Sequence, residues 1–156
     1  MKKIVIVNEN DLIGKKKNDH KDYQYTQYKV TNREDFDQCF VSIYEIEPGK
    51  SNYPMHYHKA NTEAFYIISG EGLLHTIDGE IEIKAGDVIV CPPGEEGMHK
   101  ISNTSKDAVL KYIDFDTTNS PDIVHYPNSN KIGVIVHNES CNWYKEGNSV
   151  DYYDGE

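Results

Sequence analysis

Residues 49–70 read GKSNYPMHYHKANTEAFYIISG, and this stretch carries His56 and His58 one residue apart, with Glu63 five positions further on. Side chains at positions i and i+2 of a β-strand project to the same face, so His56 and His58 are expected to point together, with Tyr57 on the other side. Two imidazoles placed in this way can share one metal ion, at about 2.0–2.2 Å from each nitrogen. The spacing therefore raises the hypothesis of a metal site on a strand.

Glu63 opens the segment EAFYIIS, which alternates in the manner of a strand. The alternation places Glu63 on the same face as Phe65, Ile67 and Ser69, a mostly apolar row that is expected to point inward. An ionised carboxylate on an inward row is costly unless a cation or hydrogen-bond donors offset it. This favours a cation beside the two histidines, where an isolated His-x-His pair would more often be two surface residues.

A third histidine, His99, follows the proline-rich turn CPPGEEGM and begins the expected strand HKISN. The turn reverses the chain and is expected to bring His99 back across the mouth of a barrel. Three imidazoles and one carboxylate form a mixed nitrogen and oxygen donor set that suits divalent first-row metals. Asn103, four residues after His99, is expected either to order the turn or to orient a ligand.

Short strands separated by turn residues predict an all-β fold. Asp78-Gly79 is a dipeptide typical of tight hairpins, and the two prolines at 92–93 end the strand before them. No segment shows a helical apolar stripe of 11 or more residues, so a sandwich or barrel is expected. The expected strands are CFVSIYEIE, EAFYIIS, the two halves of GLLHTIDGEIEIKAGD, DVIVC, MHKISN and AVLKYIDFD.

Two extensions flank this barrel segment, which we place at residues 39–117. Residues 1–38 are expected to form an N-terminal extension with short edge strands at 2–7 and around Tyr25–Val30, while Lys15–Lys17 reads as a solvated loop. Residues 118–156 are expected to form a C-terminal extension with one or two strands, among them 132–136. The aromatic and acidic tail, NWYKEGNSVDYYDGE, is predicted to pack on the barrel or on a second subunit, because exposed rings favour burial.

The amino-acid composition argues against some classes of binding partner. The 156 residues carry a formal net charge of −10, which argues against nucleic acid and anionic membranes as binding partners. The three cysteines have no Cys-x-x-Cys spacing, and no stretch approaches the roughly 18 apolar residues of a membrane span. These features predict a soluble, cytoplasmic protein with free thiols.

Two motifs resemble those of the cupin superfamily. Residues 49–70 resemble the first motif through Gly49, the His-x-His pair, Glu63 and Gly70. Residues 86–103, GDVIVCPPGEEGMHKISN, resemble the second through the five residues Gly86, Pro92, Gly94, His99 and Asn103, with four residues between Gly94 and His99 where the pattern has two. The resemblance implies a double-stranded β-helix, the jelly-roll barrel of cupins, with short terminal extensions. It also implies one divalent metal ion, Fe, Mn, Ni or Zn, held by His56, His58, Glu63 and His99.

The resemblance leaves the activity open, because cupins host many functions. One class is a metal-dependent enzyme, such as a dioxygenase, decarboxylase or isomerase, acting on a small organic molecule. A second is a non-catalytic protein that binds or senses such a molecule. A third, a metal-independent sugar epimerase, fits least well, because residues 39–117 carry few lysines and no arginine. Cupins of this size imply a homodimer, and the remaining candidates, His75 and Cys91, are interpreted as structural.

Overall fold

Antiparallel strands provide nearly all the regular structure in the computed structural model, which describes residues 4–32 and 38–156. Within these ranges the helical elements are three short 3-10 turns, and no helix has the length and apolar character needed to cross a bilayer. The strands are β1 (Lys15–Lys17), β2 (Tyr25–Lys29), β3 (Cys39–Ile46), β4 (Tyr57–His58), β5 (Glu63–Ser69), β6 (Glu71–Thr76), β7 (Gly79–Lys84), β8 (Val88–Cys91), β9 (His99–Asn103), β10 (Leu110–Thr117), β11 (Asp122–Tyr126), β12 (Lys131–Val136) and β13 (Ser140–Lys145). The 3-10 turns are η1 (Glu9–Asp11), η2 (Glu95–Gly97) and η3 (Pro127–Ser129).

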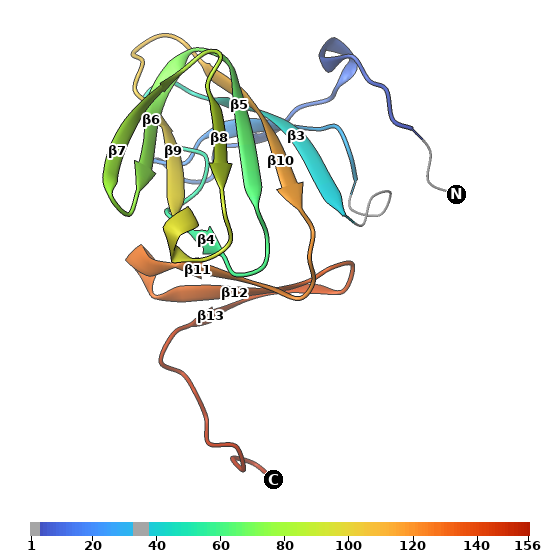
Figure 1. Cartoon of the computed structure of the whole chain (residues 1–156), viewed down its shortest axis with the longest axis vertical. Helices are drawn as coiled ribbons and strands as arrows, with labels where there is room; N and C mark the ends of the chain where they lie inside the picture. Colours follow the sequence, from blue (N-terminus) through green and yellow to red (C-terminus); the bar gives the residue numbers. More distant parts are fainter. Residues whose placement is uncertain (1–3, 33–37) are drawn as a thin grey trace.

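The strands form three sheets, and two of them make a barrel (Figure 1). The larger sheet has the order β1-β2-β3-β10-β5-β8, and the smaller has the order β7-β6-β9. A third sheet, β13-β12-β11-β4, lies across one end of the barrel (Figure 1). The expected all-β fold is confirmed.

The core lies inside the barrel and is rich in aromatic side chains. Tyr112 on β10 is fully buried and stacks on Tyr44 of β3, with ring centroids 5.3 Å apart. Phe65 on β5 meets the Tyr112 ring edge-on, with ring centroids 5.6 Å apart. Aromatic pairs in these geometries add stability beyond the area that they bury. The other buried members of this core cluster are Tyr25, Ile46, Ile67, Leu74, Ile83, Cys91, Ile101 and Leu110.

The lengthened turn before His99 is accommodated by η2, so β9 still begins at His99. At the far end of β9, the Asn103 side chain donates to the backbone oxygens of Ile46 at 2.9 Å and Ala108 at 2.8 Å. Its own oxygen accepts from the Ser105 amide at 2.9 Å. Asn103 therefore orders the turn that leads to β10, whereas the turn that it was expected to order is the proline-rich one before His99.

The N-terminal extension differs from expectation at two places. Ile4–Val7 form no strand, and residues 2 and 3 lie outside the described ranges. The expected strand at 2–7 is wrong for the described part, because the structure offers it no neighbouring strand and a lone strand is not stable. Lys15–Lys17, expected as a loop, is an edge strand paired with β2. Lysines are common on edge strands, where their charge opposes pairing with another chain.

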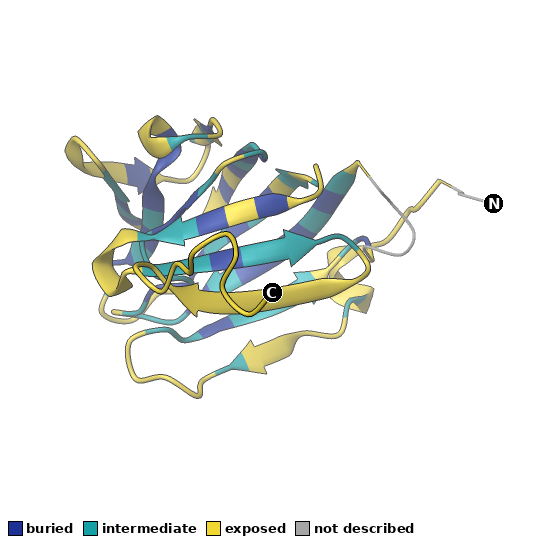
Figure 2. Cartoon of the chain, turned by 90° about the horizontal axis from the view of Figure 1, so that it is seen from below, coloured by how far each residue is buried: buried dark blue, intermediate teal, exposed yellow. Residues whose placement is uncertain are grey.

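The C-terminal extension has three strands, where one or two were expected. Their outermost member, β13, is exposed along its whole length (Figure 2). Residues 147–156 are exposed and run away from the barrel (Figure 1). The prediction that the tail packs on the barrel is therefore wrong for these residues, and packing on a second subunit stays a prediction.

Replacing Asn103 with alanine is expected to lower the free energy of unfolding by about 1–3 kcal/mol, because it removes the donor to two backbone oxygens in a buried turn. Urea unfolding of the two proteins measures the difference. Thr104→Ala, next along the chain and exposed, is the matched control and should change the stability by less than about 0.5 kcal/mol. Equal stability of the Asn103→Ala variant and the wild type would contradict this role.

Candidate metal centre

Three side chains converge at the barrel end that faces the third sheet. His56, His58 and Glu63 each place a ligand atom within 4.8 Å of the others, close enough to hold one metal ion. Glu63 Oε2 lies 3.6 Å from His56 Nε2, and Glu63 Oε1 lies 3.5 Å from His58 Nε2. His99 joins the same carboxylate, with its Nε2 3.0 Å from Glu63 Oε2. The structure thus brings all four candidate ligands together around Glu63.

The backbone positions these side chains. His56 and His99 face each other in an isolated antiparallel bridge, with hydrogen bonds of 3.1 and 2.9 Å between their backbone groups. His58 lies on β4, which pairs with β11, and Glu63 is the first residue of β5. Tyr57 projects the other way and stacks on His125 of β11 at 4.8 Å. The expected sharing of one face by His56 and His58 is confirmed, although His56 precedes β4.

Each imidazole is held by its Nδ1 atom. Nδ1 of His56 lies 2.9 Å from the Pro54 oxygen, and Nδ1 of His99 lies 2.9 Å from the Gly97 oxygen. A carbonyl oxygen only accepts, so both Nδ1 atoms carry the proton and donate. In the neutral ring Nε2 then holds a free lone pair, and this atom faces Glu63 in both residues. This is the form of histidine that binds metal.

His58 is oriented by an acid that the sequence did not indicate. Its Nδ1 donates to Oδ2 of Asp122, the first residue of β11, and Asp122 Oδ1 accepts from the Ala60 amide at 2.9 Å. Asp122 is 2% exposed. Burial raises the pKa of the Asp122 carboxyl, but the hydrogen bonds from His58, Asn61 and the Ala60 amide together with the His58 charge outweigh it, and the pKa is lowered. A carboxylate behind a ligand histidine fixes the ring and makes its free nitrogen a stronger donor.

The charges of the site require compensation. Burial raises the pKa of Glu63, but the three histidines outweigh it and hold that pKa well below its ordinary value. Its Oε2 is buried and accepts no hydrogen bond from the described residues. Burial lowers the pKa of His58, yet Asp122 and Glu63 together raise it to about 10. A buried carboxylate surrounded by three imidazole nitrogens is a site for either protons or a divalent cation.

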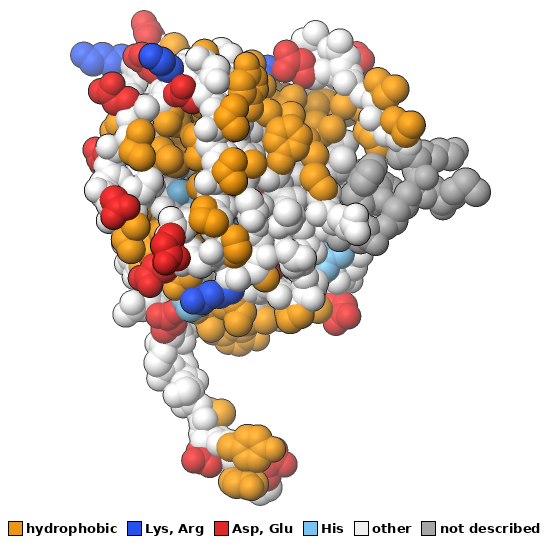
Figure 3. Space-filling view, in the orientation of Figure 1, with side chains coloured by type: hydrophobic (Ala, Val, Ile, Leu, Met, Phe, Trp, Pro, Cys, Tyr) orange, Lys and Arg blue, Asp and Glu red, His pale blue; other side chains and the backbone are white. Residues whose placement is uncertain are grey.

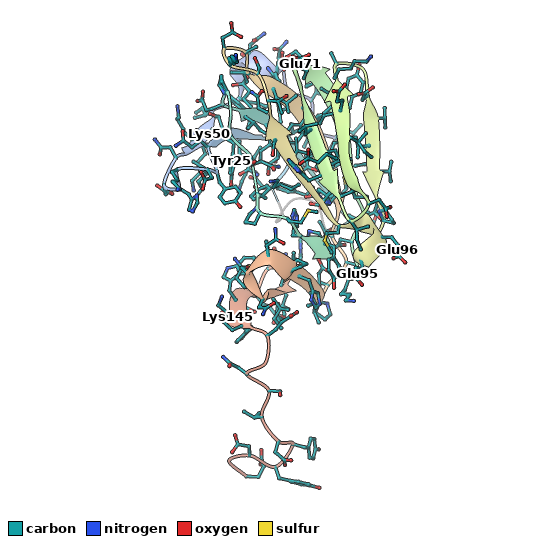
Figure 4. The ribbon with its side chains drawn as sticks, turned by 90° about the vertical axis from the view of Figure 1, so that its left-hand side faces the viewer. Tyr25, Lys50, Glu71, Glu95, Glu96 and Lys145 are labelled. Carbon is teal, nitrogen blue, oxygen red and sulfur yellow. The ribbon has the colours of Figure 1, made fainter. Side chains whose placement is uncertain are left out.

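A cavity of about 330 Å³ adjoins these residues. Tyr126 and Trp143, from the third sheet, line it together with His56, His58 and Glu63. The Tyr126 ring stacks on His56 at 5.6 Å, and Trp143 meets Tyr126 edge-on at 5.4 Å. In Figure 4, Glu95 and Glu96 mark the barrel end that faces the third sheet, and Glu71 marks the opposite end. Lys145 lies on the third sheet. The C-terminal extension therefore lines the cavity together with the barrel.

The other candidates lie outside the cluster. His75 bonds Ser102 at 2.8 Å and Glu80 at 2.9 Å on the small sheet. Cys91 is buried and pairs with Glu63 across β5 and β8, next to the site but outside the group that could hold a metal. Tyr66, on the face of β5 opposite to Glu63, is exposed. Besides Asp122, two cavity carboxylates that sequence reasoning missed are Asp114 and Asp116, whose only signal is alternation along β10.

Comparison with known proteins agrees with this geometry. The cupin domain family matches residues 42–116, the stretch that holds the four candidate ligands. Residues 42–116 form a cupin domain. Its fold is the double-stranded β-helix of cupins, as its resemblance to solved cupin structures shows. The fold and family expected from the two motifs are confirmed.

Individual relatives of this cupin differ in what their names state. It is 40% identical over 60 residues to an oxalate-binding protein of Thermotoga maritima, and 42% identical over 59 residues to an uncharacterized protein of Methanocaldococcus jannaschii. These matches cover 38% and 37% of the chain, and 47% and 45% of the two relatives, so the chain spans about half the length of each. A sugar phosphate isomerase from Silicibacter pomeroyi matches with a TM-score of 0.79 at 15% identity, covering 96% of this chain and 98% of that one. At this identity the match shows the fold alone.

Asp122→Asn is expected to weaken metal binding by about 10–100-fold, because it removes the carboxylate that orients His58 and strengthens its Nε2 as a donor. Competitive titration of metal-stripped protein with Zn²⁺ against a chromophoric chelator measures the affinity. Asp78→Asn, in an exposed hairpin turn, is the matched control and should bind like the wild type. Unchanged affinity in the folded Asp122→Asn variant would show that His58 needs no such support.

Proposed function

We propose that this cupin binds one divalent metal ion through His56, His58, Glu63 and His99, and that it binds or transforms a small organic molecule in the adjoining cavity. One observation carries the proposal. The Nε2 atoms of three histidines face a buried carboxylate, and backbone oxygens fix His56 and His99 in the form that leaves Nε2 free to bind a metal. The mixed donor set suits Fe, Mn, Ni or Zn.

The chain's own residues divide the work. Asp122 holds His58 in place, and the His56–His99 bridge fixes the two imidazoles across the barrel mouth. Tyr126 and Trp143 line the cavity on the side of the third sheet. A divalent metal at these ligands would supply Lewis-acid polarisation of an oxygen atom in the bound molecule. The site thus fits an enzyme of the dioxygenase, decarboxylase or isomerase type.

A binding or sensing role without chemistry is the second candidate. The relative from Thermotoga maritima is named for binding oxalate, not for converting it. Both candidates predict thermal stabilisation by the ligand, but only an enzyme consumes it. Incubation of metal-loaded protein with a stabilising compound, followed by mass spectrometry, separates them: a new product supports the enzyme, and an unchanged compound supports the binding protein.

Protein purified without chelators and without a histidine tag is expected to contain about one equivalent of a divalent metal by elemental analysis, and His56→Ala is expected to lose it. The loss follows because one of the imidazoles next to Glu63 disappears. His75→Ala removes a histidine that lies outside the cluster and should retain the metal. A wild-type protein that holds no metal and takes up none from Fe²⁺, Mn²⁺, Ni²⁺ or Zn²⁺ would overturn the proposal.

We further infer that the protein works as a homodimer in the cytoplasm. The outer side of β5, β8 and β10 carries exposed apolar side chains in adjacent positions, a surface that we call the outer apolar face (Figure 3). It comprises Tyr66, Ile68, Val88, Val90 and Phe115. Such contiguous apolar surface marks an interaction site, and a two-fold axis lets the same face cover itself. The proposed cytoplasmic location is supported by the free thiols of Cys39, Cys91 and Cys141.

Size-exclusion chromatography with light scattering is expected to give twice the chain mass of 17.9 kDa. Val88→Lys with Val90→Lys should shift the protein to the monomer, because a charge buried in an apolar interface is unpaired. Ile77→Lys changes an equally exposed apolar residue near the Asp78-Gly79 turn, outside the face, and should leave the dimer intact. A monomeric wild type would rule out the dimer.

A further inference from the structure

A serine, a histidine and a glutamate form a hydrogen-bonded chain on the outer face of the small sheet. His75 Nε2 lies 2.8 Å from Ser102 Oγ, and His75 Nδ1 lies 2.9 Å from Glu80 Oε1. His75 comes from β6, the central strand, and the other two come from its neighbours β9 and β7. A hydroxyl within hydrogen-bond reach of an imidazole, with a third group that orients the imidazole, is the arrangement that activates a serine nucleophile.

The position of each proton in this chain follows from the partners. The Glu80 carboxylate only accepts, so His75 Nδ1 carries the proton that lies between them. Burial and the positive charge of Lys100 lower the pKa of His75 more than Glu80 raises it, so the ring is mainly neutral at pH 7. Nε2 of the neutral ring has only a lone pair, and it accepts from the Ser102 hydroxyl. Ser102 can therefore give its proton directly to the imidazole.

A second hydroxyl, that of Ser51, lies beside the first. Its Oγ is 2.8 Å from Ser102 Oγ, and because the Ser102 proton points to His75, Ser51 is the donor of this pair. Ser51 is 9% exposed, and an isolated backbone bridge joins it to Ser102, so the donor is held in place. A fixed hydroxyl donor next to a nucleophile can stabilise the negative charge that develops on an attacked carbonyl oxygen.

A hollow of about 440 Å³ adjoins Ser102 on the same face of the sheet. Leu73, which lies opposite Ser102 in the pairing of β6 with β9, lines this hollow, and so does Thr104, two residues after Ser102. Ser102 and His75 are only half-buried, so a molecule in the hollow can reach them. The charged residues of the lining are Glu71, Glu82 and Lys84. This excess of negative charge, in a chain of net charge −10, disfavours an anionic ligand.

We propose that Ser102 is the nucleophile of a second site, which hydrolyses small uncharged carboxylic esters. Ser102 Oγ attacks the carbonyl carbon, and its proton passes to His75 Nε2. The bond between that carbon and the alcohol oxygen breaks, and the leaving alcohol takes the proton from His75. Water then attacks the acyl-serine and gives a proton to His75, and breakage of the bond to Oγ returns this proton to Ser102 and releases the carboxylic acid. Glu80 touches no reacting atom and is a positioning residue for His75.

This site is separate from the proposed metal centre. Along β9, His99 and Ile101 are buried on the barrel side, whereas Lys100 and Ser102 belong to the opposite face. The ester hydrolysis uses none of the candidate metal ligands. It is therefore expected to persist when metal is removed, and the inference does not depend on the proposed function.

A fluorophosphonate probe, which reacts covalently with activated serine hydroxyls, tests the inference on the full chain. After incubation and tryptic digestion, fragmentation mass spectrometry is expected to find the probe on Ser102. The same label is expected in metal-loaded protein and in protein stripped by a chelator. Absence of label, label only on other residues, or label that is lost with the metal would each overturn the inference.

Hydrolysis of p-nitrophenyl acetate by metal-stripped protein measures the activity. Ser102→Ala and His75→Ala are each expected to lower kcat/KM at least about tenfold, because they remove the nucleophile and the general base. Ser140→Ala, on the exposed strand β13, is the matched control and should equal the wild type. An unchanged rate in either folded variant would overturn the inference, and should a variant fail to fold, the labelled residue of the wild type decides.

The positioning role of Glu80 has its own readout. Glu80→Ala is expected to lower kcat for p-nitrophenyl acetate at least about tenfold and to leave KM within about threefold of the wild type, because Glu80 orients the base without touching the substrate. An unchanged kcat in this variant would contradict the role of Glu80.

Discussion

Burial of the Glu63 carboxylate is the constraint around which this site is organised. The residue opens β5 on the inward face, where its Oε2 accepts no hydrogen bond from the described residues. Burial raises the pKa of an isolated carboxyl group, so that it would take up a proton. Three histidines prevent this and hold its pKa well below the ordinary value. The positions of His56, His58 and His99 are therefore those that keep one buried negative charge stable.

The C-terminal extension supports the site and is more than an appendage. Asp122 on β11 orients His58, and β11 is the strand that pairs with β4. Tyr57, between the two histidines, is fixed from behind by its stack on His125 of the same strand. Tyr126 then covers His56 from the cavity side. Each histidine of the first motif thus depends on a residue more than sixty positions later, because the third sheet closes the barrel end where the candidate ligands lie.

Local periodicity and spacing were enough to predict the barrel strands, the inward row of Glu63, and the shared face of His56 and His58. The return of His99 was also expected, since a turn that begins with prolines reverses the chain, and η2 takes up the extra residues. Asp122 and Asp114 could not be found in this way. Their role depends on which strands are neighbours in three dimensions. From the sequence alone, an aspartate on a half-exposed strand is predicted to be a surface residue. The N-terminal run Ile4–Val7 misled for a related reason: it has the composition of a strand but no partner to pair with.

Protonated histidines and a bound metal ion are two alternative ways of balancing the buried negative charge of Glu63. Without a cation, Asp122 and Glu63 raise the pKa of His58 to about 10, and the pKa of His99 is also raised, so protonated imidazoles can balance Glu63 at neutral pH. A divalent ion at the centre of the cluster would bring the same balance and would release those protons as it binds.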